Sequence, residues 1–161
     1  MSCFADSSAL VKLYAEEIGR AEVLAAERMT MLVSDLARVE VPAALWKKHR
    51  AGEITVEDAQ LLTDQFTADL HGTRSTVPRW PSLSVTGRVL DHAAQLAAAH
   101  SLRAYDAVQL ATALAAREID PTLDLFVCFD KGLNKAAEAE GFRLVDSIAA
   151  PATEAPKTTR Q

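Results

Sequence analysis

Short runs of apolar residues alternate along the chain with longer segments in which apolar residues recur every three or four positions. The short runs are typical of buried strands, and the longer segments are typical of amphipathic helices. Strands are expected at 3–5, 31–33, 125–129 and 142–145, with a weaker candidate at 83–85. Helices are expected at 7–15, 20–28, 34–50, 55–70, 86–100, 104–117 and 130–140.

The order of these elements predicts an α/β fold. Strands that alternate with helices favour a mostly parallel sheet that is covered by helices on both faces. Neither an internal repeat nor a long linker divides the chain, so one domain is expected over 1–148. Residues 149–161 are mostly Ala, Pro, Thr and charged residues, a composition that predicts a disordered C-terminal tail.

The composition limits the class of protein and its cellular location. The chain has 161 residues, of which 49% are hydrophobic and 24% charged, as in ordinary globular proteins. It shows no signal-peptide pattern and no apolar run of membrane-spanning length, and its two cysteines lie in expected strands. A cytoplasmic protein is therefore expected. The formal net charge of -5 argues against a surface that coats nucleic acid broadly, but leaves room for a nuclease with clustered acids.

Two acidic residues are expected where a strand gives way to a helix. Asp6 ends the first strand, and Asp130 follows the strand at 125–129. Parallel pairing of these strands would bring both carboxylates to one edge of the sheet, where ligands bind in open α/β folds. The alternative is that each carboxylate only caps the helix that follows it.

Two further acids lie on apolar helix faces. Glu40 and Asp106 have mostly apolar neighbours three and four positions away, so both are expected to border the core. A buried carboxylate needs a partner, a metal ion or a proton. The alternative for Glu40 is an ion pair with Arg38 or Arg103, and for Asp106 it is a favourable place near the helix N-terminus. Pro42 is expected to kink the helix just past Glu40.

Taken together, the four acids predict a metal site. Carboxylates held close to one another repel unless a cation is present. Ligands that are all oxygen atoms favour a hard divalent ion, Mg²⁺ or Mn²⁺, and the four scattered histidines form no zinc cluster. The expected ligands are Asp6, Glu40, Asp106 and Asp130.

Around these acids the chain resembles a known family. The segments FADSSALVKLYAEE at 4–17, LRAYDAVQLATA at 102–113 and FVCFDKGLNKAA at 126–137 are similar to motifs of the PIN-domain ribonucleases. Within that family they resemble the VapC toxins of bacterial toxin–antitoxin pairs. The helix around Glu40 supplies a weaker second motif, and the resemblance covers residues 3–146.

The resemblance implies a three-layer α/β/α sandwich with the four acids in one pocket. It also implies a ribonuclease that depends on Mg²⁺ or Mn²⁺, an RNA substrate, a cognate antitoxin protein that occludes the acidic site, and a homodimer. Two positions depart from the family pattern. Cys128 stands where family members often have Thr or Ser, and Pro42 lies beside the second acid.

The expected mechanism is metal-assisted hydrolysis, in which bound ions hold the scissile phosphate and activate a water for in-line attack. Asp6 and Asp106 are the expected direct ligands. Glu40 and Asp130 are expected to hold water, orient the ligands or complete a second metal site.

Several other residues are candidates for supporting this site. Ser8 is expected either to place its hydroxyl near the metal or to cap the first helix. Asn134 lies one helical turn past Asp130 and is expected either to hydrogen-bond it or to face solvent. The candidate RNA phosphate contacts are Lys12, Arg103, Lys131 and Lys135.

Other classes fit the acids less well. A phosphoacceptor receiver domain has adjacent acids after its first strand, but here Ser7 and Ser8 follow Asp6. A phosphatase of the haloacid-dehalogenase type has a second acid two places after the first, where this chain has Ser8. The main alternative to an enzyme is a catalytically silent PIN-like module that binds RNA or a partner.

Overall fold

The computed structural model describes residues 1–145; the tail expected at 149–161, and the expected domain end at 148, lie outside the described residues. The strands of the described part are β1 (Ser2–Ala5), β2 (Thr30–Ser34), β3 (Ser82–Leu83), β4 (Leu123–Val127) and β5 (Arg143–Leu144). Its helices are α1 (Ser7–Tyr14), α2 (Arg20–Ala26), α3 (Ala37–Arg50), α4 (Val56–His71), α5 (Gly87–His100), α6 (Ala104–Ile119) and α7 (Lys131–Ala139). Each expected element has a counterpart among them.

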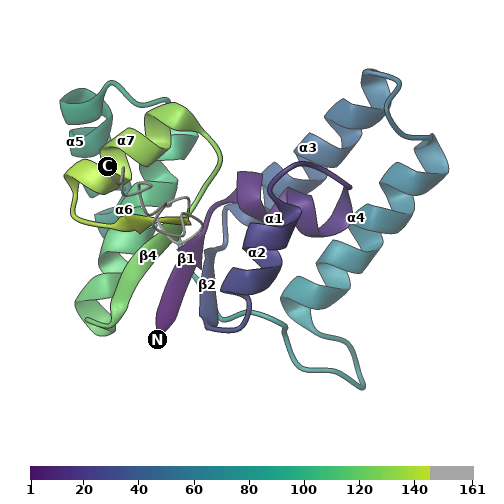
Figure 1. Ribbon diagram of the computed structural model, residues 1–161, viewed down its shortest axis with the longest axis horizontal. Helices are drawn as coiled ribbons and strands as arrows, with labels where there is room; N and C mark the ends of the chain where they lie inside the picture. The colour runs from purple at the N-terminus through teal and green to yellow at the C-terminus, as the bar shows by residue number, and fades with distance from the viewer. Residues whose placement is uncertain (146–161) are drawn as a thin grey trace, which may run out of the picture.

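The strands form one parallel sheet in the order β3-β2-β1-β4-β5. Helices α5, α6 and α7 cover one face, and α1 to α4 lie on the other, where α3 and α4 extend away from the sheet as a pair (Figure 1). The predicted α/β fold with a parallel sheet between helical layers is therefore confirmed.

Successive side chains of a strand point to opposite faces of the sheet, so the buried apolar residues form two clusters, one on each face. Phe4 and Phe126 point toward α5, α6 and α7 and stack with their ring centroids 5.6 Å apart. Cys3 and Leu125, which precede them, belong to the apolar cluster on the opposite face. This period of two is the pattern of strands that are buried on both faces.

The end of β4 differs from the expected one. β4 ends at Val127, two residues before the expected end, because the sulfur of Cys128 accepts the Asp130 amide and the chain turns toward α7. Apolar character continues through Phe129, so the sequence pattern does not show where pairing stops. α3 runs through Pro42 and ends at Arg50, where its end was expected.

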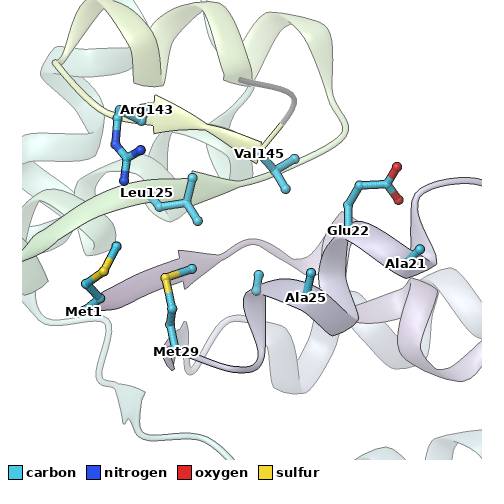
Figure 2. Close-up of a pocket in the computed structure, with 9 residues that line it drawn as sticks. Met1, Ala21, Glu22, Ala25, Met29, Leu125, Arg143 and Val145 are labelled. Atoms are coloured by element: carbon cyan, nitrogen blue, oxygen red, sulfur yellow. The ribbon is translucent and has the colours of Figure 1, made fainter. Parts of the chain in front are cut away.

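A hollow of about 540 Å³ lies away from the acids, between α2 and the β4–β5 side of the sheet (Figure 2). Its lining includes Met29, Leu125 and Val145, and none of the four expected acids contributes to it. We therefore look for the active site at the edge of the sheet where Asp6 and Asp130 are expected, and not in this apolar hollow. Within residues 1–145, no helix has the length and apolar character needed to cross a membrane.

Candidate active site

The carboxyl ends of β1, β2 and β4 meet at one edge of the sheet because these strands are parallel. Asp6 follows β1 directly, and its amide donates a hydrogen bond to the Val127 carbonyl, 3.1 Å away. Asp130 follows β4 after two intervening residues and precedes α7. Two of the expected acids therefore lie at the same edge.

Asp6 is buried and its carboxylate is held in a fixed direction. The residue is 5% exposed, and its Oδ1 accepts hydrogen bonds from the Ala9 amide at 3.1 Å and the Ser8 hydroxyl at 2.7 Å. The first of these caps α1, as the simpler reading of the sequence predicts. Burial raises the pKa of Asp6 to about 6, although hydrogen bonds, with Ser8 the largest, oppose the rise. A cation beside Asp6 would stabilise its ionised form.

Ser8 and Cys128 connect Asp6 to the segment between β4 and α7. The Ser8 hydroxyl accepts a hydrogen bond from the Phe129 amide at 3.0 Å, and it lies 3.8 Å from the Cys128 sulfur. The sulfur accepts a hydrogen bond from the Asp130 amide at 3.2 Å. Burial raises the pKa of the Cys128 thiol, and the charge of Asp6 adds to this rise. Cys128 therefore acts as a protonated thiol that holds the turn before α7.

Glu40, in the first turn of α3, is held by two buried side chains from other helices. Its Oε2 accepts hydrogen bonds from the Ser7 hydroxyl at 2.7 Å and from the Gln109 amide at 2.6 Å. Gln109 also donates to the Ser7 oxygen at 3.0 Å. Since Gln109 lies one helical turn past Asp106 on α6, this triad connects Glu40 with the helix that carries the third acid.

Arg103 joins Asp106 to Asp130. Its Nε donates to Oδ2 of Asp106 at 2.9 Å, and its Nη2 donates to Oδ2 of Asp130 at 3.3 Å. The hydrogen bond to Asp106 is the largest cause of a raised pKa at Arg103, and the charges of Asp106, Asp130 and, more weakly, Glu40 also raise it. Three of the four acids are therefore within electrostatic reach of one guanidinium.

The sequence order of these acids and the fold around them match a known family. A family model for the PIN domain matches residues 3–139. The chain belongs to the PIN domain family. Two relatives from Mycobacterium tuberculosis are VapC proteins: ribonuclease VapC45 of strain CDC 1551 / Oshkosh and ribonuclease VapC49 of strain ATCC 25618 / H37Rv. Each is 38% identical over 144 residues, an alignment that covers 86% of this chain and 91% of the relative. The chain is thus a VapC-type PIN domain.

Solved structures support the same fold. PAE2754 from Pyrobaculum aerophilum superposes with a TM-score of 0.60 at 20% identity, covering 92% of this chain and 92% of its own. FitAcB from Neisseria gonorrhoeae superposes with a TM-score of 0.59 at 16% identity, covering 88% of this chain and 95% of its own. At these identities the likeness concerns the fold alone.

A divalent ion, which the PIN family implies, fits the chemistry of this edge. All four acids supply hard oxygen donors, the buried Asp6 makes hydrogen bonds but no ion pair among the described residues, and Arg103 already provides positive charge between two of the others. As the side chains stand, no three His, Cys, Asp or Glu residues within 1–145 are arranged to hold a metal ion. The carboxylate donors of this PIN domain are thus of the type that suits the ion, but among the described residues they do not converge on one site, and Arg103 contacts two of them.

The structure also places the residues that were expected to support the site. The capping alternative for Ser8 is wrong, because Asp6 caps α1 and the Ser8 hydroxyl donates to Asp6. The expectation for Asn134 is wrong in detail, because its side-chain amide donates to the Cys128 carbonyl at 3.0 Å and not to Asp130. Its Oδ1 is buried, with no partner among residues 1–145.

The four candidate phosphate contacts differ in how far their charged groups are exposed to solvent. The Lys12 ammonium donates to Glu17 at 3.0 Å and lies over the Phe129 ring, with only 11% of the side chain exposed. Its charge is thus directed to internal partners. Lys131 and Lys135 are exposed on α7, and Arg103 is exposed at the start of α6.

Ser7 and Gln109 are site residues that sequence reasoning missed. Ser7 was considered only as a helix starter, and Gln109 only as a neighbour of Asp106. Gln109 is 2% exposed, and a buried amide in an otherwise apolar helix face is a signal that it holds a polar partner. The identity of that partner, Glu40, depends on how α3 packs and is not visible in the sequence.

Proposed function

We propose that this PIN domain is an endoribonuclease that depends on Mg²⁺ or Mn²⁺ and is the toxin of a VapBC-type toxin–antitoxin pair. The observation that carries the proposal is a pair of hydrogen-bonded networks that hold the four acids. Ser8, Cys128 and Arg103 connect Asp6, Asp130 and Asp106, and Ser7 and Gln109 hold Glu40 separately. The names of the two mycobacterial relatives, both VapC ribonucleases, support the same activity.

The side chains of the two networks have different proposed roles. Asp6 and Asp106 are the proposed direct ligands of the ion, which, when bound, would supply positive charge at the scissile phosphate and lower the pKa of a water molecule. Glu40 and Asp130 orient the water and the other ligands. Ser7 and Gln109 fix one carboxylate oxygen of Glu40, and Ser8 fixes Oδ1 of Asp6, so these two acids are held in place before substrate arrives.

The wider setting of the enzyme is part of the same proposal. The domain spans 1–148, acts in the cytoplasm and forms a homodimer, and a cognate antitoxin protein occludes the acidic edge. These statements are supported by membership of the VapC-type PIN domains. The exposed ends of the network at Asp130 and Arg103 are consistent with a site that a large partner or an RNA can reach.

Cleavage of RNA by the purified protein tests the proposal. A pool of labelled RNAs should be cut in Mg²⁺ or Mn²⁺ and left intact in EDTA. Asp6→Asn and Asp106→Asn should each lower the cleavage rate by about 100-fold or more, as expected for lost metal ligands. The matched control is Asp64→Asn, which removes an exposed carboxylate from α4 and should cut like the wild type.

Two outcomes would each contradict a part of the proposal. Cleavage that persists in EDTA or in Asp6→Asn would remove the metal or Asp6 from the chemistry. RNA that is bound but never cut, in any divalent ion, would favour the catalytically silent binding module.

A further inference from the structure

Arg103 contacts two of the four acids of the candidate ion site. It precedes α6, and its guanidinium bridges one carboxylate oxygen of Asp106, 2.9 Å away, and one of Asp130, 3.3 Å away. The Arg103 side chain is 78% exposed, while that of Asp106 is 17% exposed. A solvent-exposed cation is therefore paired with a carboxylate that is mostly shielded from solvent.

This pairing conflicts with ion binding. Arg103 contacts one of the two carboxylate oxygens of Asp106. A divalent ion bound at this oxygen would be repelled by the positive guanidinium. The other oxygen of Asp130, Oδ1, accepts the Leu133 amide at 2.9 Å and caps α7. Its remaining oxygen is the one that Arg103 holds. The same guanidinium thus contacts one carboxylate oxygen of Asp106 and the only oxygen of Asp130 that does not cap α7.

We propose that Arg103 is a displaceable counter-ion of the site, which leaves Asp106 and Asp130 when a divalent ion binds and then contacts a phosphate of the RNA. The inference rests on the proposed function and assigns Arg103 two successive partners. In the first state it neutralises acids that would otherwise repel one another. In the second it is a positioning residue for the substrate.

The chemistry of arginine suits both partners. Its planar guanidinium binds carboxylates and phosphates with the same pairs of N–H donors, and its charge is retained at any working pH. The exposure of the side chain means that leaving the two acids does not require the core to move. Exposed ion pairs are weak, so the charge of a divalent ion is sufficient to replace them.

The test compares Arg103→Met with a matched control. Methionine keeps the apolar length of the side chain and removes its charge. Arg88→Met is the control, because Arg88 is 81% exposed and also forms an ion pair, with Glu118 at 2.7 Å, away from the four acids. Binding of Mn²⁺ alone, without RNA, is measured by titration calorimetry, and circular dichroism confirms that each variant is folded.

Removal of the competing charge should tighten ion binding. Arg103→Met should bind Mn²⁺ about three- to tenfold more tightly than the wild type, and Arg88→Met should match the wild type. Equal or weaker binding by Arg103→Met would overturn the proposal, since Arg103 would then be neutral or helpful to the ion.

RNA cleavage at saturating Mn²⁺ tests the second partner. Loss of a phosphate contact should raise KM for RNA about tenfold and leave kcat nearly unchanged. An unchanged KM would overturn the phosphate contact. If wild-type protein neither binds Mn²⁺ nor cuts RNA, the proposed function fails together with this inference. If it does both and Arg103→Met gains no affinity, only the inference fails.

Discussion

Replacing Asp6 with asparagine should stabilise the metal-free protein while removing its activity. The hydrogen bonds from Ala9 and Ser8 both end on Oδ1, and an asparagine side chain keeps an oxygen that can accept them. Asparagine is also as good a helix N-cap as aspartate. The main change is therefore the loss of a buried negative charge.

The size of the effect follows from the pKa of Asp6. Burial raises this pKa from 3.8 to about 6. At a pH above both values, such a rise lowers the free energy of unfolding by about 3 kcal/mol, because a tenfold change in an acid constant is worth about 1.4 kcal/mol. Asp6→Asn should recover most of this amount. Asp6 is only 5% exposed, so screening by solvent reduces it little.

The effect has a defined pH window. Between pH 4 and 6 the folded protein holds a proton on Asp6 that the unfolded chain has lost, so wild-type stability falls as the pH rises through this range. The advantage of Asp6→Asn should grow over the same range and then level off. Bound Mg²⁺ should reduce this advantage, because an ion at 100 times its Kd stabilises the wild type by about 2.7 kcal/mol.

Urea unfolding in EDTA at pH 4.5 and pH 7.5 measures these differences. Asp64→Asn provides the baseline, as its exposed carboxylate should change stability little at either pH. If Asp6→Asn were no more stable than the wild type at pH 7.5, or equally favoured at both pH values, the reasoning about a buried unpaired carboxylate would be refuted.

Two further substitutions test the residues around the acids. Gln109→Leu should lower the single-turnover cleavage rate about 10- to 100-fold by releasing Glu40, with the fold retained; an unchanged rate would show that this amide does not position Glu40. Cys128→Ser should cut RNA within about threefold of the wild type, because a hydroxyl also accepts the Asp130 amide, at a stability cost of about 1 kcal/mol. Cys128→Ala, which has no acceptor, should cut more slowly, and equal rates for the two variants would refute a role for the hydrogen bond.

The sequence was sufficient to predict the fold and the edge at which the acids lie. Buried parallel strands leave continuous apolar runs, and Asp6 interrupts such a run at the point where α1 begins. The same logic located Asp130, although β4 stops two residues earlier than its apolar run. The pattern of apolar residues shows which side chains are buried, but it does not show where the hydrogen bonds between strands end.

The partners of the acids were not predictable in the same way. Glu40 was expected to face a metal or an arginine, but Ser7 and Gln109 hold it, at sequence separations of 33 and 69 residues. Local spacing along a helix carries no information about contacts between helices that are distant in sequence. Arg103 was considered as a phosphate contact or as a partner of Glu40, and its bridge between two acids appears only when α6 and α7 are packed together.

Anomalous diffraction from crystals loaded with Mn²⁺ is the most direct test of the central claim. We expect a peak of anomalous density beside the carboxylates of Asp6 and Asp106, with the Arg103 guanidinium turned away from the ion. No peak at this edge, at a Mn²⁺ concentration that supports RNA cleavage, would contradict a metal site formed by these acids.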